Sequence, residues 1–164
     1  MKKIILDTNI YGELVKETDL LKIKDRIKGK EDIIYGVDII RMELRDTPRG
    51  VRLSNKNLRI SLLSLYDEFV GKHTIQLNEE MIKTAEKYYK GYKEFGGVRP
   101  MKDIINDFYI VACASRKEMN IVVTNDNCTM LGELSVKAYK LVNEILNLRT
   151  PEFWGYSSFK RWLL

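Results

Sequence analysis

Short apolar runs alternate along this chain with longer segments of helical periodicity. Five runs have the length and composition of buried strands, at residues 2–7, 32–38, 73–77, 120–126 and 137–143. Helical spacing of apolar positions is found at residues 9–28, 38–46, 54–71, 79–95 and 101–119. Strands that alternate with helices predict an α/β fold, in which helices cover both faces of a mostly parallel sheet of about five strands.

Capping residues and a glycine-rich stretch mark the boundaries of these elements. Asn78 begins a pattern typical of a capped helix, and Pro100 suits the first turn of the next helix. Residues 91–100 contain three glycines and a proline, which predict a loop between the two helices. Because the chain shows no repeat and no low-complexity tract, we expect a single domain over residues 1–164.

The C-terminal segment differs in character from the rest of the chain. Residues 151–164 hold both tryptophans and two of the five phenylalanines. We interpret this aromatic segment as a helix that packs on the sheet. The alternative is a surface for a partner or a second copy of the chain.

Composition narrows the class of protein. Hydrophobic residues make up 45% and charged residues 31%, a balance typical of a folded soluble protein. The net charge of +5 favours an anionic partner such as nucleic acid without identifying one. The chain has two cysteines, no apolar stretch of signal-peptide type and none of membrane-spanning length, so we expect a reducing cytoplasm and no membrane.

Four acidic side chains occupy positions where α/β proteins form ligand sites. Asp7 follows the first predicted strand and Asp126 follows the fourth, and ligands bind beyond the carboxyl ends of parallel strands. If these strands are neighbours, both carboxylates lie in one cleft. Glu43 lies on the helix after the second strand. Asp107 lies among apolar residues of a helix, where a carboxylate needs a cap role, a cationic partner or a metal.

Each acid also has a purely structural explanation. Asp7 can cap the helix that follows it, Asp126 can form a turn with its asparagine neighbours, and Glu43 can be an exposed helix residue between arginines. Carboxylates gathered in one cleft repel one another, so such a site either retains protons or binds a cation. Hard oxygen ligands favour Mg²⁺ or Mn²⁺.

In order and spacing, four segments resemble successive motifs of the PIN domain family, which includes VapC-type toxin ribonucleases. They are LDTN at 6–9, RMELR at 41–45, NDFYIVACA at 106–114 and VVTND at 122–126. The resemblance implies a three-layer α/β/α fold. It also implies a set of catalytic acids that bind the metal, namely Asp7, Glu43, Asp107 and Asp126. The chain departs from the family at residues 127–129, where an aspartate and a phenylalanine are common.

The resemblance further implies supporting residues. Family members place a small polar residue after the first aspartate to orient it or a metal-bound water, and we favour Asn9 over Thr8 for this role. Thr124, in the last strand motif, is another supporting residue. Asp103 lies one turn before Asp107 on the same helix face. We favour it as an acid at the helix N-terminus over a further role beside the metal.

The activity implied is that of an endoribonuclease with Mg²⁺ or Mn²⁺ as cofactor, leaving 5′-phosphate and 3′-hydroxyl ends. A divalent ion would make water nucleophilic and neutralise charge on the phosphate. Likeness to the toxins implies a homodimer and a protein antitoxin that blocks the cleft. The alternatives are a catalytically inactive PIN-like scaffold that binds RNA or protein, and an aspartyl-phosphate phosphotransferase, which normally needs an aspartate where this chain has Asn9.

RNA requires positive charge near such an acidic cleft. The densest basic stretch of the chain begins beside Glu43 and could hold phosphates at the rim of the site. Its first members are Arg41, Arg45, Arg49 and Arg52. The alternative is a solvated helix face with ordinary charge pairs.

Overall fold

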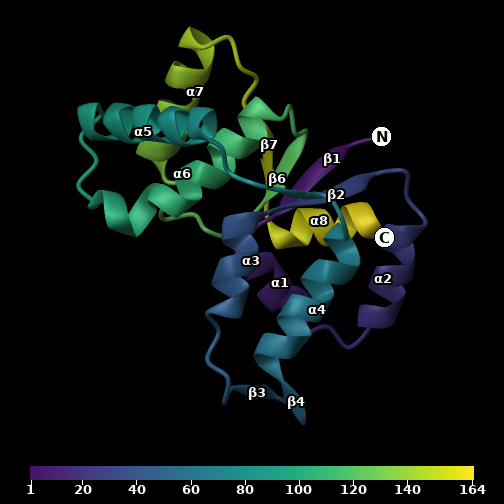
Figure 1. Cartoon of the computed structure of the whole chain (residues 1–164). Coiled ribbons are helices and arrows are strands. Elements are labelled where there is room, and N and C mark those ends of the chain that lie inside the picture. The colour runs from purple at the N-terminus through teal and green to yellow at the C-terminus, as the bar shows by residue number, and fades with distance from the viewer.

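A five-stranded parallel sheet forms the centre of the chain in a computed structural model that describes residues 1–164 (Figure 1). Its strands are β1 (Lys3–Leu6), β2 (Ile33–Val37), β5 (Thr74–Ile75), β6 (Ile121–Val123) and β7 (Glu152–Trp154). They lie in the order β5-β2-β1-β6-β7, and every pairing is parallel. A separate antiparallel hairpin consists of β3 (Arg52–Leu53) and β4 (Lys56–Asn57).

Helices cover both faces of this sheet. They are α1 (Thr8–Leu14), α2 (Leu20–Lys28), α3 (Asp38–Arg45), α4 (Leu58–Val70), α5 (Glu79–Glu94), α6 (Met101–Arg116), α7 (Glu133–Ile145) and α8 (Tyr156–Leu163). Figure 1 shows α5, α6 and α7 together on one side of the sheet, and α1, α3 and α4 on the other. The three-layer α/β/α architecture is therefore confirmed. None of the helices has the length and hydropathy needed to cross a bilayer.

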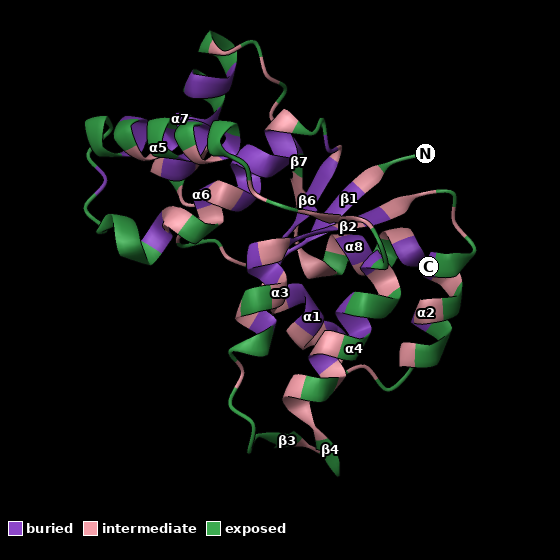
Figure 2. Cartoon of the chain, viewed as in Figure 1, coloured by how far each residue is buried: buried purple, intermediate pink, exposed green.

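The core follows from the apolar runs in the sequence. Because both faces of a parallel sheet are covered, its inner strands need continuous apolar residues rather than alternation. Every residue from Ile4 to Leu6 and from Ile121 to Val123 is buried. Figure 2 shows this burial along β1 and β6 and on the inward faces of the helices.

The strand order places a topological switch between β1 and β6. From β1 the chain moves outward to β2 and β5, and it then returns to β6 on the other side of β1. Leu6 pairs with Val123, and the Asp7 backbone nitrogen donates to the Val123 carbonyl at 2.9 Å. The two strands therefore end side by side, and a crevice at such a switch point is where open α/β sheets bind ligands.

One predicted strand is wrong. Residues 137–143 lie within helix α7, and the fifth strand of the sheet is instead β7. The reason is visible in the burial pattern, because Ala138, Tyr139 and Val142 are buried while Lys137 and Lys140 are exposed. This spacing places the buried residues on one face of a helix that packs against α5.

The aromatic C-terminal segment contributes both an edge strand and a helix. Strand β7 pairs with β6, and α8 follows it directly. Phe159 and Leu163 of α8 are buried. Glu17, in the turn after α1, accepts hydrogen bonds from Tyr156 Oη at 2.6 Å and Lys160 Nζ at 2.8 Å, so α8 is fastened to the N-terminal part of the fold.

Element boundaries follow local capping chemistry. Asn78 Oδ1 accepts a hydrogen bond from the Met81 nitrogen at 2.9 Å, which confirms the capped start of α5. Helix α4 begins later than the predicted residue 54, because Asn57 caps it through a bond from the Ile60 nitrogen at 3.1 Å. The residues before this cap form the β3–β4 hairpin, which the sequence pattern did not predict.

Candidate active site

Asp7 is the most enclosed of the acidic residues at the switch point. It directly follows β1, caps α1 and is only 5% exposed. Its Oδ1 accepts from the Thr8 nitrogen at 2.8 Å, and its Oδ2 accepts from Asn9 Nδ2 at 3.0 Å and from Thr124 Oγ1 at 2.8 Å. The helix cap and the cleft residue are thus one side chain, held in place by three donors.

Thr124 connects the ends of β1 and β6. Its hydroxyl is buried, donates to Asp7 and accepts from the Asp126 nitrogen at 3.0 Å. Asn9 adds a second link, because its Oδ1 accepts from the Asn125 nitrogen at 3.1 Å. The structure therefore places two of the predicted supporting residues, Asn9 and Thr124, between the two aspartate-bearing loops.

Glu43, on α3, approaches Asp7 from another element. It is half-buried, and its Oε2 accepts from Thr8 Oγ1 at 3.0 Å. Neither flanking arginine pairs with Glu43. The Arg41 guanidinium makes two bonds of 3.0 Å to Asp67, and Arg45 forms no ion pair. Glu43 is thus oriented by the residue that follows Asp7, and it is not the exposed helix glutamate that its neighbours alone would suggest.

Asp107 enters the cleft from α6 and meets the loop that contains Asp126. Thr129 Oγ1 lies 2.5 Å from Asp107 Oδ2 and also contacts Asp126 Oδ2. Asp126 Oδ1 accepts from the backbone nitrogens of Cys128 at 3.0 Å and Thr129 at 2.8 Å. The backbone of the loop after β6 therefore hydrogen-bonds to the Asp126 carboxylate, and the Thr129 hydroxyl contacts both Asp107 and Asp126.

Sequence reasoning missed Thr129. In the sequence, residues 127–129 stood out only because they depart from the family pattern. The signal that was present is the spacing of a short acid and a threonine three residues later, which is typical of local side-chain to backbone hydrogen bonds. Such a spacing predicts a wrapped loop, but it does not predict that the hydroxyl also reaches α6.

Burial and mutual repulsion set the protonation of these acids. Burial raises the pKa of Asp7, and the charge of Asp126 raises it further. Burial raises the pKa of Glu43, again with a contribution from Asp7. For Asp107, burial and then the charges of Asp7, Asp126 and Glu43 raise the pKa to about 7. Asp107 is thus close enough to the other three carboxylates for their charges to raise its pKa.

Asp126 is the exception within this group. Burial raises its pKa, but hydrogen bonds from the Thr129 side chain and from the backbone of the same loop outweigh burial and lower the pKa overall. The Thr129 hydroxyl has one hydrogen and can donate to one carboxylate at a time. With Asp107 protonated, its own hydroxyl can donate to Thr129 while Thr129 donates to Asp126.

These residues fit a divalent cation in their chemistry. Four carboxylates supply the hard oxygen ligands that Mg²⁺ and Mn²⁺ prefer, and a cation among them would relieve the repulsion that raises three of their pKa values. In their present orientations, no three His, Cys, Asp or Glu side chains form a group that could hold one ion. The threonine hydroxyls lie between the acids instead, so binding requires the carboxylates to turn toward a common point.

The remaining predicted residues lie outside this cluster. Asp103 is exposed in the first turn of α6, and its side chain makes no hydrogen bond or ion pair within the chain. The side chain of Arg41 is engaged by Asp67, which leaves it less available to a phosphate. Arg45, Arg49 and Arg52 are exposed and form no ion pair.

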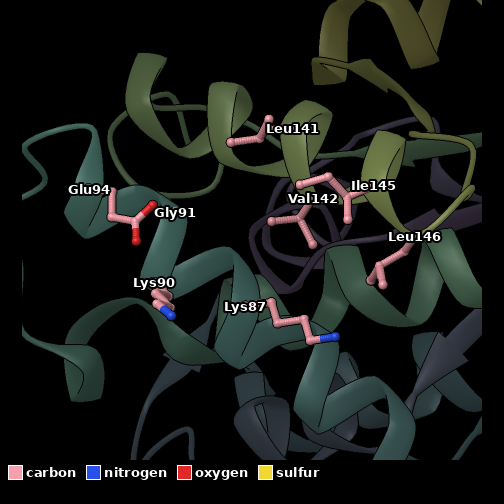
Figure 3. Close-up of a pocket in the computed structure, with 8 residues that line it drawn as sticks. All are labelled: Lys87, Lys90, Gly91, Glu94, Leu141, Val142, Ile145 and Leu146. Carbon is pink, nitrogen blue, oxygen red and sulfur yellow. The ribbon is translucent and has the colours of Figure 1, made fainter.

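A hollow elsewhere on the molecule is unrelated to the acidic cleft. It has a volume of about 310 Å³ and lies between α5 and α7, with Leu141, Val142 and Ile145 on one side and Lys87 and Lys90 on the other (Figure 3). Its walls carry one carboxylate and no member of the acidic cluster. The acids at the switch point therefore remain the candidate active site.

Comparisons with known proteins support this architecture. No family model and no curated protein matches the chain. Among solved structures, a chain of VapBC-1 from nontypeable Haemophilus influenzae is 19% identical, with a TM-score of 0.59 over 94% of this chain and 98% of its own. A chain of VapBC2 from Rickettsia felis, bound to a DNA fragment from their promoter, is 16% identical, with a TM-score of 0.61 over 93% and 98%.

A third structure, FitAB bound to an IR36 DNA fragment, has a chain that is 18% identical, with a TM-score of 0.59 over 93% of this chain and 94% of its own. These likenesses extend over nearly the whole length of each chain. The protein therefore has the PIN-domain fold that the sequence motifs predicted. Because one fold hosts many functions, the activity of this protein depends on the chemistry of its site.

Proposed function

We infer that this protein is a divalent-metal-dependent endoribonuclease. The observation that carries the proposal is the meeting of four carboxylates from four separate segments at the switch point of a PIN fold. A purely structural role explains one capping aspartate or one turn aspartate. It does not explain why Glu43 and Asp107, two half-buried acids on separate helices, both lie near enough to Asp7 for its charge to raise their pKa.

Some of these residues would bind the ion, and others orient the carboxylates that bind it. Asp7, Asp107 and Asp126 would hold the ion directly, and Glu43 would do so directly or through water. Asn9 and Thr124 fix the Asp7 carboxylate, and Thr8 fixes Glu43. When bound, a divalent ion supplies a more acidic water and neutralises charge on the phosphate oxygens. The chain itself contributes to the orientation, because hydrogen bonds from Thr8, Asn9, Thr124 and Thr129 hold the four carboxylates.

The structural neighbours also support a partner. They come from VapBC and FitAB toxin–antitoxin complexes. We extend this to the present chain and propose a toxin whose cleft is covered by a protein antitoxin, with RNA as substrate, a homodimer as the active form and the cytoplasm as the compartment.

A second candidate, the PIN-like scaffold without catalysis, is favoured by one observation. The acids are bridged by hydroxyl groups, and no three of them surround one point. If that arrangement persists in solution, the cleft binds no ion and the protein acts by binding RNA or another protein.

Metal binding separates the two candidates. Calorimetry with Mn²⁺ on the wild type and on Asp7→Asn, Asp107→Asn and Asp126→Asn, with thermal melts to confirm folding, is the first measurement. Asp103→Asn is the matched control on the same helix as Asp107. The nuclease proposal is supported if Mn²⁺ binding and RNA cleavage are both lost in the three aspartate variants and both kept in the Asp103→Asn control. Equally weak binding in all five proteins supports the scaffold.

A further inference from the structure

A basic arm extends from the end of α3. We define it as residues 45–57, which comprise the last residue of α3, the following turn and the β3–β4 hairpin. Figure 1 shows the hairpin at the tip of the molecule, away from the central sheet. In Figure 2 the same segment is largely exposed. The arm begins two residues after Glu43, on the helix that carries this acid into the cleft.

The arm has an excess of positive charge. Its cations are Arg45, Arg49, Arg52 and Lys56, and all four are exposed. No ion pair of the protein involves any of them. After Asp46, the sequence contains no aspartate or glutamate until Asp67. Arg41 differs from these cations because Asp67 already neutralises it.

Hydrogen bonds hold the hairpin in a defined place. Arg52 pairs with Asn57, and Leu53 pairs with Lys56. The Leu58 nitrogen donates to the Val51 carbonyl at 2.9 Å. Asn57, the cap of α4, also donates to the Arg49 carbonyl at 2.6 Å. The arm is therefore continuous with two helices, and its cations are positioned rather than carried on a loose loop.

The pairing also places charge on both faces of the hairpin. Side chains directly opposite each other share a face, and consecutive residues alternate between faces. Lys56 therefore lies on the face of Leu53, and Arg52 lies on the opposite face. A narrow projection with cations on two sides suits a groove or fold of a polyanion whose phosphates lie on both sides of it.

The acidic cleft makes such a surface necessary for a nuclease. Its carboxylates repel phosphate, so affinity for RNA has to come from cations outside the cleft. We propose that the basic arm binds the RNA backbone at a distance from the cleavage position and increases the affinity for long substrates. This inference rests on the proposed function, which gives RNA as the substrate. It adds that the basic arm is the surface that binds the RNA backbone.

Two matched triple variants test the proposal. One is Arg49→Gln, Arg52→Gln and Lys56→Gln in the arm. The other is Lys87→Gln, Lys90→Gln and Lys93→Gln on α5, where all three lysines are exposed and unpaired. Each variant removes three positive charges from the surface. Binding to a fluorescent single-stranded RNA is measured by anisotropy over a range of salt concentrations, with Asp7→Asn present in every protein to prevent cleavage.

We expect the arm variant to weaken binding roughly tenfold at low salt and to reduce the slope of log K against log salt by about 2, as loss of three phosphate contacts requires. The control variant should change the slope by less than half as much. Equal losses in both variants would overturn the proposal, because they would show a general charge effect. Unchanged binding in the arm variant would also overturn it, and would leave the arm as a surface for an acidic protein.

Cleavage distinguishes failure of this inference from failure of the proposed function. In the wild-type background, the arm variant should raise KM for a long RNA and leave kcat unchanged, while a short oligonucleotide that spans only the cleft is cut as before. Normal cleavage of long RNA by the arm variant contradicts the inference alone. Absence of cleavage by the wild type, with arm-dependent binding intact, contradicts the nuclease alone.

Discussion

Thr129 and Asp107 are joined by a hydrogen bond of 2.5 Å between a threonine hydroxyl and a helix carboxylate. The same hydroxyl contacts Asp126, so the loop after β6 and helix α6 meet at one oxygen atom. Because the hydroxyl can donate to one acid while it accepts from the other when that acid is protonated, this contact stabilises the paired acids when no cation is present.

Replacing Thr129 by valine should therefore destabilise the metal-free protein. We expect the free energy of unfolding to fall by about 1–2 kcal/mol, the cost of leaving half-buried acceptors without a donor. Urea denaturation in the presence of a chelator measures this change. Thr129→Ser keeps the hydroxyl and is the control. Equal stability of the valine variant and the wild type would show that the bridge contributes nothing.

The pKa of about 7 at Asp107 predicts an unusual pH dependence of stability without metal. Between the ordinary value of 3.8 and about 7, folded Asp107 retains a proton that the unfolded chain has released. Its contribution therefore makes the free energy of unfolding fall as pH rises through this window. Asp107→Asn removes the titration and should flatten the curve, whereas Asp103→Asn should not. Melting temperatures in chelator across the window test this, and parallel curves for all three proteins would contradict it.

Gly36 is required by the close approach of Tyr66 to β2. A Cβ atom at position 36 would lie 1.9 Å from the Tyr66 hydroxyl oxygen. Tyr66 is 1% exposed and bonds to Thr74 Oγ1 at 2.9 Å, so it has little room to move. Gly36→Ala should cost about 1–3 kcal/mol of stability through overpacking. Gly12→Ala, with no atom within 4 Å of the added carbon, should be neutral or stabilising in helix α1. Chemical denaturation of both variants checks the contrast.

Tyr11 carries a buried hydroxyl that has no hydrogen-bond partner. Removing it in Tyr11→Phe removes an uncompensated polar group, so we expect stability to stay equal or to rise by up to about 1 kcal/mol. Tyr88→Phe is the opposite case, because its hydroxyl bonds to Asn143 at 2.5 Å and Ser115 at 3.2 Å. That variant should lose about 1–3 kcal/mol. Similar effects of the two substitutions on the unfolding midpoint would contradict this interpretation.

Local patterns in the sequence were sufficient for much of the fold. Apolar runs predicted four of the five strands of the sheet, and capping residues predicted the start of α5, because these depend on neighbouring residues. Residues 137–143 were misassigned because a short stretch in which apolar residues alternate with Lys137 and Lys140 suits a strand and a helix face equally. The packing of α7 on α5 decides between them.

In the candidate site too, some features follow from neighbouring residues and others from the packing of the whole chain. Adjacent positions in the sequence are enough to show which acids follow strands or lie among apolar residues. The folded chain is needed to show that β1 and β6 are neighbours, that Thr8 holds Glu43 near Asp7, and that Thr129 reaches Asp107. These contacts join residues far apart in the chain. They depend on strand order and helix placement, which are set by how the whole core packs and not by any local pattern.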